Sequence, residues 1–135
     1  MLYEYDLVVP ANTLAASPAS LEMPLSRGII TKIEAQFPAG CQGVVLVVVR
    51  RALHQVWPTN PDGQLKANAY VISTPEHYEL LESPYQLQAY GWSPGTTYSH
   101  TITLRFTVLL PEVLRPVTRS DSIIERLGAL VLGRR

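Results

Sequence analysis

The sequence is poor in cysteine and in charge. Cys41 is the single cysteine among 135 residues, and only 16% of the residues are charged. One cysteine excludes an internal disulfide and any multi-cysteine metal site. Eleven Lys and Arg balance eleven Asp and Glu, so no net field attracts nucleic acid or anionic lipid. We therefore expect no nucleic-acid partner. The low charge also favours a surface that is covered by other subunits.

A long hydrophobic run is also lacking. The most apolar stretch, Val44 to Val49, has six residues, whereas a helix needs roughly 20 to cross a bilayer. Because five of the six are β-branched, residues 43–49 predict a core strand covered on both faces, and no membrane partner. Cys41, just before it, is expected to be a small buried residue, with a reactive thiol as the alternative. The first six residues include Glu4 and Asp6 where a signal peptide is basic, so we expect the protein to stay in the cell that makes it, a virus-infected cell included.

Alternating polar and apolar residues dominate the first 110 positions. Eleven prolines and eight glycines punctuate the chain, and such short alternating segments predict strands. Because Pro24 cannot donate to a ladder, the segment around it is predicted to be an edge strand. We predict an all-β domain over residues 1–110, an antiparallel β-sandwich or jelly-roll-like barrel. Its predicted strands are residues 2–9, 21–25, 29–37, 43–49, 53–57, 69–73, 76–82, 85–90 and 99–110.

The strands differ in how clearly their faces can be assigned. Residues 99–110 give the clearest pattern, with Ile102, Leu104, Phe106 and Val108 facing inward. Residues 29–37 predict one continuous alternation that begins at Ile29. The turn at residues 38–40 makes this strand and the core strand neighbours, either in one sheet or across the sandwich. Residues 76–82 suit a helix or a strand, and the all-β context favours a strand.

Residues 111–135 have a different character from the domain before them. Residues 111–119 contain two prolines and no glycine, which predicts an extended arm. Ser122 and Glu125 then have the spacing of a helix capping box. The apolar positions after it fall on one helical face: Ile123, Ile124, Leu127, Leu130 and Val131. A helix this short needs a surface to dock on. The sequence leaves three such surfaces open: the chain's own sandwich, a neighbouring subunit and, less favoured, a membrane.

Candidate catalytic and metal-binding residues are few. His54, His77 and His100 fall on three predicted strands at spacings that match no metal motif, and we expect them to be structural. The chain has no nucleophile elbow and no glycine-rich phosphate loop. We therefore expect no catalytic residues, no metal and no cofactor. Calcium binding around the Pro-Asp-Gly turn, by Asn60, Asp62 and Asn68, is the open alternative.

Aromatic residues near strand ends are the other candidates for function. They are Trp57, Trp92, Tyr85, Tyr90 and Tyr98. Such side chains fill cores, anchor protein interfaces or stack on sugar rings. We predict Trp57 and Trp92 as interface residues, together with the apolar set of the C-terminal helix.

Three tracts resemble those of small β-sandwich virion proteins of tailed phages. They are residues 37–46, 57–63 and 98–106, and the resemblance extends over roughly residues 28–110. It implies a capsid decoration (cement) protein or a similar accessory structural subunit, without catalytic residues. It further implies a homo-oligomer, with a trimer favoured, that contacts the major capsid protein or other virion subunits. Such a protein is located in the virion and assembled in the host cytoplasm.

A second function remains open on the sequence. The chain is alternatively a carbohydrate- or cell-surface-binding β-sandwich module, in which Trp57 and Trp92 are the stacking platforms.

Overall fold

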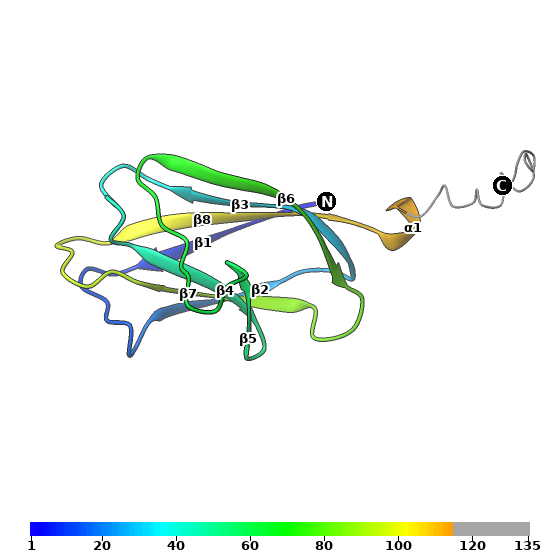
Figure 1. Ribbon diagram of the computed structural model, residues 1–135, viewed down its shortest axis with the longest axis horizontal. Coiled ribbons are helices and arrows are strands. Elements are labelled where there is room, and N and C mark those ends of the chain that lie inside the picture. Colours follow the sequence, from blue (N-terminus) through cyan, green and yellow to red (C-terminus); the bar gives the residue numbers. More distant parts are fainter. Residues whose placement is uncertain (115–135) are drawn as a thin grey trace, which may run out of the picture.

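The computed structural model describes residues 1–114, which form a sandwich of two four-stranded antiparallel sheets (Figure 1). Sheet I has the strand order β1-β8-β3-β6, and sheet II has the order β2-β7-β4-β5. This confirms the predicted all-β class. The strands are β1 (Leu2–Val9), β2 (Ala19–Pro24), β3 (Gly28–Phe37), β4 (Leu46–Arg51), β5 (His54–Trp57), β6 (Tyr70–Leu80), β7 (Gln86–Trp92) and β8 (His100–Leu109).

The connections between the strands define a jelly roll. Each strand is followed by one in the opposite sheet, except that β4 and β5 are neighbours in sheet II. Eight strands in two sheets with this crossing order form the pair of Greek keys of that architecture. Strand β2 lies at an edge of sheet II, as Pro24 predicts.

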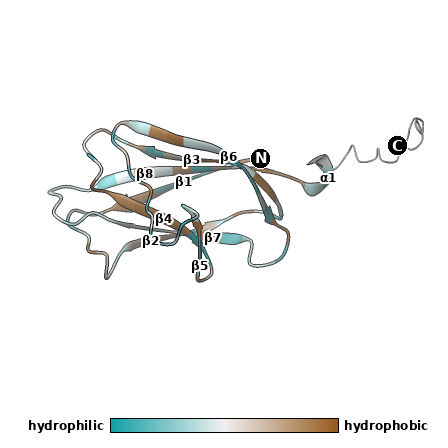
Figure 2. Ribbon diagram, viewed as in Figure 1, coloured by the Kyte–Doolittle hydropathy of each residue, from teal (hydrophilic) through white to brown (hydrophobic). Residues whose placement is uncertain are grey.

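The core lies between the sheets and follows the alternation of the strands. Strand β8 buries Ile102, Leu104, Phe106 and Val108, as predicted from the sequence. In the middle of sheet II, β4 buries Val47 and Val49 in the same core, and Figure 2 shows β4 coloured hydrophobic along most of its length. Cys41 is fully buried, as expected, and its burial raises the pKa of the thiol.

A β-bulge corrects the predicted faces of residues 29–37. The register of β3 shifts between Ile30 and Lys32 against both β6 and β8. As a result Ile30 joins the core cluster and Ile29 does not, although the alternation alone places Ile29 inward. A bulge adds one residue to one strand, so the side chains before it change faces.

The predicted core strand of residues 43–49 begins three positions later, at Leu46. The preceding residues form a turn in which the Val44 N–H donates to the Cys41 carbonyl at 2.9 Å. Gln42 and Gly43, the central residues of this turn, have φ of 48° and 73°, the conformation of a type I′ turn. Strands β3 and β4 lie in opposite sheets, so they are neighbours across the sandwich.

Two predicted strands, residues 69–73 and 76–82, are one strand in the structure. Strand β6 runs without interruption through Pro75. This is possible because β6 is an edge strand and Pro75 lies opposite the bulge of β3, where the ladder is already irregular.

After β8, residues 111–114 form a single helical turn, α1 (Pro111–Leu114), rather than the predicted extended arm. Proline suits the first position of a helix because the N–H there has no intrahelical partner. The remaining predictions for this segment, including its apolar set of Ile123, Ile124, Leu127, Leu130 and Val131, lie outside the described residues.

Candidate functional site

Four loops meet at the end of the sandwich that is remote from the N-terminus and α1 (Figure 1). They connect β1 to β2, β3 to β4, β5 to β6 and β7 to β8, and we call this the loop end. Two asparagines link the loops. Asn12 of the first loop accepts from Gly95 N–H at 2.7 Å through its side chain. Asn68 of the third loop accepts from Gly40 N–H and Gln42 N–H at 2.9 and 3.0 Å.

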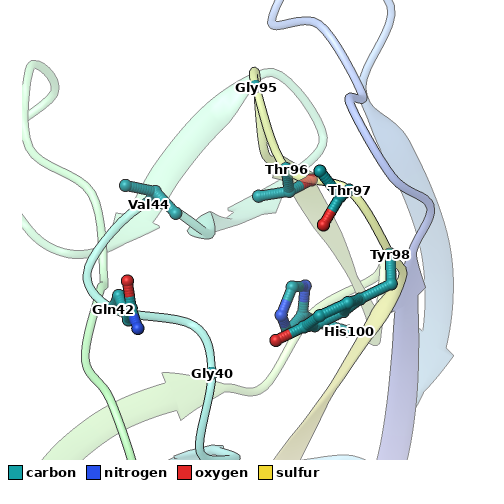
Figure 3. Close-up of a pocket in the computed structure, with 8 residues that line it drawn as sticks. All are labelled: Gly40, Gln42, Val44, Gly95, Thr96, Thr97, Tyr98 and His100. Atoms are coloured by element: carbon teal, nitrogen blue, oxygen red, sulfur yellow. The ribbon is translucent and has the colours of Figure 1, made fainter.

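A pocket of about 200 Å³ lies between the β3–β4 and β7–β8 loops (Figure 3). We call it the loop-end pocket. Figure 3 shows Gln42 on one side of the space and Thr97, Tyr98 and His100 on the other. The complete lining is Gly40, Gln42, Val44, Gly95, Thr96, Thr97, Tyr98 and His100.

His100 has an unusual environment at the floor of this pocket. Its side chain is only 6% exposed, and neither ring nitrogen has a hydrogen-bond partner within residues 1–114. The ring packs against Tyr98 with a centroid distance of 4.7 Å. Buried polar atoms are nearly always paired with protein, water or ligand. The imidazole therefore needs a partner that the described residues do not supply.

Gly40 keeps the floor of the pocket open. Its φ is 100°, and a Cβ added there would lie 2.8 Å from Tyr98 Oη and 3.7 Å from His100 Nε2. A side chain at this position would therefore be strained and would fill the space in front of both polar atoms.

The two outer faces of the sandwich differ in polarity. On sheet I the guanidinium of Arg105 reaches Glu4 at 3.2 Å, Glu34 at 3.7 Å and Gln36 at 2.7 Å. Thr103 adds a hydrogen bond to Asp6 at 2.8 Å. The middle of this face is therefore polar and internally bonded, as expected for a sheet that faces water, while Leu2 and Val8 of β1 are exposed apolar residues on the same sheet.

Sheet II carries an apolar patch on its outer face. In the register of β4 and β7, Leu46 lies opposite Trp92 and Val48 lies opposite Tyr90. These four residues alternate with core residues, so their side chains point away from the core. Val48 is buried, and the other three are partly exposed. We call Leu46, Val48, Tyr90 and Trp92 the sheet II patch.

The structure separates the two tryptophans predicted as interface residues. Trp92 belongs to the sheet II patch. Trp57 is 4% exposed, packs on Tyr78 and Phe106, and donates its indole N–H to Glu76 at 3.0 Å. It is therefore a core residue of the described sandwich and presents no exposed face to a partner or to a sugar.

The three histidines are placed on three different strands, β5, β6 and β8, as predicted. His54 and His77 are exposed. Within residues 1–114, no group of three or more His, Cys, Asp or Glu side chains could hold a metal ion.

The calcium candidates of the β5–β6 loop make hydrogen bonds within the protein. Asn60 donates to Asp62 at 3.2 Å, whereas Asn68 binds the β3–β4 loop. The structure therefore pairs Asn60 with Asp62 and directs the side-chain oxygen of Asn68 to another loop.

Sequence reasoning names Tyr98 and His100 separately and misses Gln42 and Thr97 as pocket residues. The only local signal is the set of loop glycines, since Gly40, Gly43 and Gly95 all have positive φ.

Within the described part of the chain, no helix is long and apolar enough to cross a membrane.

Fold and site together define an all-β jelly-roll module with a small, neutral pocket at one end. No protein-family model matches the chain, and a search of curated proteins found no match.

Three solved structures are similar to the chain at low levels. The Yersinia pseudotuberculosis-derived mitogen is 9% identical with a TM-score of 0.42, over 81% of this chain and 86% of that one. The Bacillus endospore appendages, a family of disulfide-linked pili, are 15% identical with a TM-score of 0.35, over 81% and 90%. A family two carbohydrate esterase from Cellvibrio japonicus is 13% identical with a TM-score of 0.30, over 82% of this chain and 36% of the esterase. Because all three TM-scores are low, these similarities carry no argument about function.

Proposed function

We propose that this chain is a non-enzymatic structural subunit of a virus particle, a capsid decoration (cement) protein that associates with further copies and stabilises the shell. The observation that carries the proposal is the cross-strand apolar patch of sheet II, in which Leu46 lies opposite Trp92 and Val48 lies opposite Tyr90. A contiguous apolar patch on one face is a feature of association surfaces. The jelly roll is also an architecture of viral capsid domains, which supports the proposal by analogy only.

The sheet II patch and the C-terminal segment are the two contact elements of this proposal. In it, the patch of one subunit receives the apolar set of a neighbouring copy, Ile123, Ile124, Leu127, Leu130 and Val131. The partly exposed Leu46, Tyr90 and Trp92 of the patch offer such a segment an apolar surface to bury, which is what an amphipathic helix of this length needs. A closed ring of such exchanges is a symmetric oligomer, with a trimer favoured. The major capsid protein or other virion subunits would then contact the oligomer.

Substitution of the patch tests the association. We expect the full chain to be a defined oligomer by light scattering, and the double variant Leu46→Thr with Trp92→Thr to be a monomer. Threonine suits strands, so the sandwich is retained while the apolar surface is lost. The matched control is Leu2→Thr with Val8→Thr, which removes two exposed apolar side chains from sheet I and leaves the mass unchanged.

Two outcomes would contradict the association. One is a full-length chain that is monomeric, and the other is a patch variant that keeps the wild-type oligomeric mass. The virion role has its own test, in which particles purified from a lysate that contains the protein are analysed by mass spectrometry. Absence of the chain from purified particles would reject that role even if the oligomer forms.

The alternative function is a carbohydrate- or cell-surface-binding module. Trp57 cannot be one of its two sugar-stacking residues, because its side chain is buried. The observation that favours this alternative is a different one, the loop-end pocket with its unpaired His100.

A further inference from the structure

We propose that the loop-end pocket is a binding site for one neutral sugar ring, with His100, Gln42 and Thr97 as its polar contacts and Tyr98 as its aromatic wall. The pocket and the sheet II patch share no residue, although Leu46 and Trp92 of the patch stand two and three positions from the lining residues Val44 and Gly95. The pocket lies at the end of the molecule opposite to α1 (Figure 1).

The first argument is the unmet hydrogen bonding of His100. A neutral imidazole has one donor nitrogen and one acceptor nitrogen, and in this chain both are buried without a partner among residues 1–114. Leaving such atoms unpaired costs free energy that a bound molecule can recover. A Cβ at Gly40 would lie 3.7 Å from Nε2 of the buried His100 ring, and the glycine leaves this space next to the ring without a side chain.

The second argument is the neutrality of the lining. None of the eight lining residues is a Lys, Arg, Asp or Glu. A charged ligand would give up its hydration here without gaining a counter-charge. The site therefore favours an uncharged ligand over a phosphate, a sulfate or a carboxylate.

The third argument is the type of polar group that the pocket offers. The Thr97 and Tyr98 hydroxyls, the Gln42 amide and the His100 imidazole each donate and accept hydrogen bonds. Hydroxyl groups on a ligand do the same, so a polyhydroxylated ring can pair with all four. The Tyr98 ring, 56% exposed, adds an apolar surface for the C–H face of such a ring.

The size and the rigidity of the pocket agree with this ligand. Its volume of about 200 Å³ is below the roughly 300–1,000 Å³ of sites for drug-sized molecules, so it suits one ring. Asn12 and Asn68 hold the loops on its two sides from outside the pocket. A site whose walls are fixed in advance loses less entropy on binding.

Imidazole NMR signals provide the test, because His54 and His77 are exposed, lie outside the pocket and act as internal controls. The full-length protein is titrated separately with glucose, galactose, mannose and N-acetylglucosamine, and with sodium sulfate. We expect a saturable shift of the His100 signal with at least one sugar, no shift of His54 or His77, and no effect of sulfate.

Two variants test the polar contacts without changing His100. Gln42→Gly removes the amide at a position whose φ of 48° suits glycine, and Thr97→Val removes the hydroxyl with little change of shape. Each is expected to weaken sugar binding by about tenfold, the value of one hydrogen bond. Thr101→Val, at an exposed position of β8 outside the pocket, is the matched control and leaves the affinity unchanged.

Three results would overturn the proposal. The first is that no sugar gives a saturable shift of His100, which would leave the pocket to water. The second is that only sulfate shifts the signal, which would make it an anion site. The third is that Gln42→Gly and Thr97→Val bind sugar as tightly as the wild type, which would place the sugar elsewhere.

Discussion

At the scale of one residue, His100 shows that a proposed binding site can lower the free energy of unfolding of the protein that contains it. Its two ring nitrogens are buried and unpaired in the described sandwich, and an unsatisfied buried group costs about 1–3 kcal/mol. We therefore predict that His100→Leu, which replaces the ring by an apolar side chain of similar size, increases the free energy of unfolding by about 1 kcal/mol. Urea unfolding measures this change.

The control for this substitution is His77→Leu, at an exposed position of β6, where we expect a change within about 0.5 kcal/mol. A loss of stability in the His100→Leu variant would show that the ring nitrogens are hydrogen-bonded in solution without a ligand. It would leave His100 as a structural residue.

Trp57 is a residue whose burial cannot be predicted from the local sequence. It stands at the end of β5 beside a proline-rich turn, where an exposed aromatic is as reasonable as a buried one. What places it in the core is Glu76 of β6, which accepts the indole N–H, and the packing of Phe106 of β8. Both partners are remote in sequence, so no local pattern contains this information.

At the scale of the element, Gly28 decides how closely β3 and β8 approach. A Cβ at this position would lie 2.7 Å from the carbonyl oxygen of Leu109, a backbone atom that cannot move without disturbing the ladder. We predict that Gly28→Ala lowers the free energy of unfolding by about 1–3 kcal/mol, the range for overpacking a core. Chemical denaturation checks this value.

Arg27→Ala, one position earlier and exposed, is the matched control for Gly28→Ala. It is expected to change the free energy of unfolding by less than about 0.5 kcal/mol. Equal stabilities of the two variants would contradict the close approach of the two strands at Gly28.

At the scale of the whole molecule, the described sandwich encloses its core without the C-terminal segment. The last core residue is Val108, and β8 ends at Leu109. We therefore predict that a chain ending at Leu110 folds cooperatively but is a monomer, because it lacks the apolar set that the assembly proposal assigns to residues 123–131. Circular dichroism and light scattering measure these two properties.

A full-length variant with serine at Ile123, Ile124, Leu127, Leu130 and Val131 is the matched control, since it keeps the chain length and removes only the apolar face. It should also be a monomer. If either chain forms the wild-type oligomer, the C-terminal segment is not the contact element, and the sheet II patch must associate in another way.

The sequence by itself determined the periodic features of this protein. Alternation and turn residues are local, and they gave the all-β class, the strand of residues 2–9 and the four apolar inward positions of β8. This works because the side-chain period of a strand is a property of its own backbone. The predicted edge position of β2 follows equally from one local residue, Pro24.

Only the tertiary structure decided which elements meet. The bulge of β3, the continuity of β6 through Pro75 and the burial of Trp57 all depend on neighbours from other parts of the chain. The loop-end pocket has the same origin, because Gln42 and His100 come together only where the jelly-roll crossings bring the β3–β4 and β7–β8 loops to one end. Contacts between distant segments are set by strand order and sheet packing, and a local pattern carries neither.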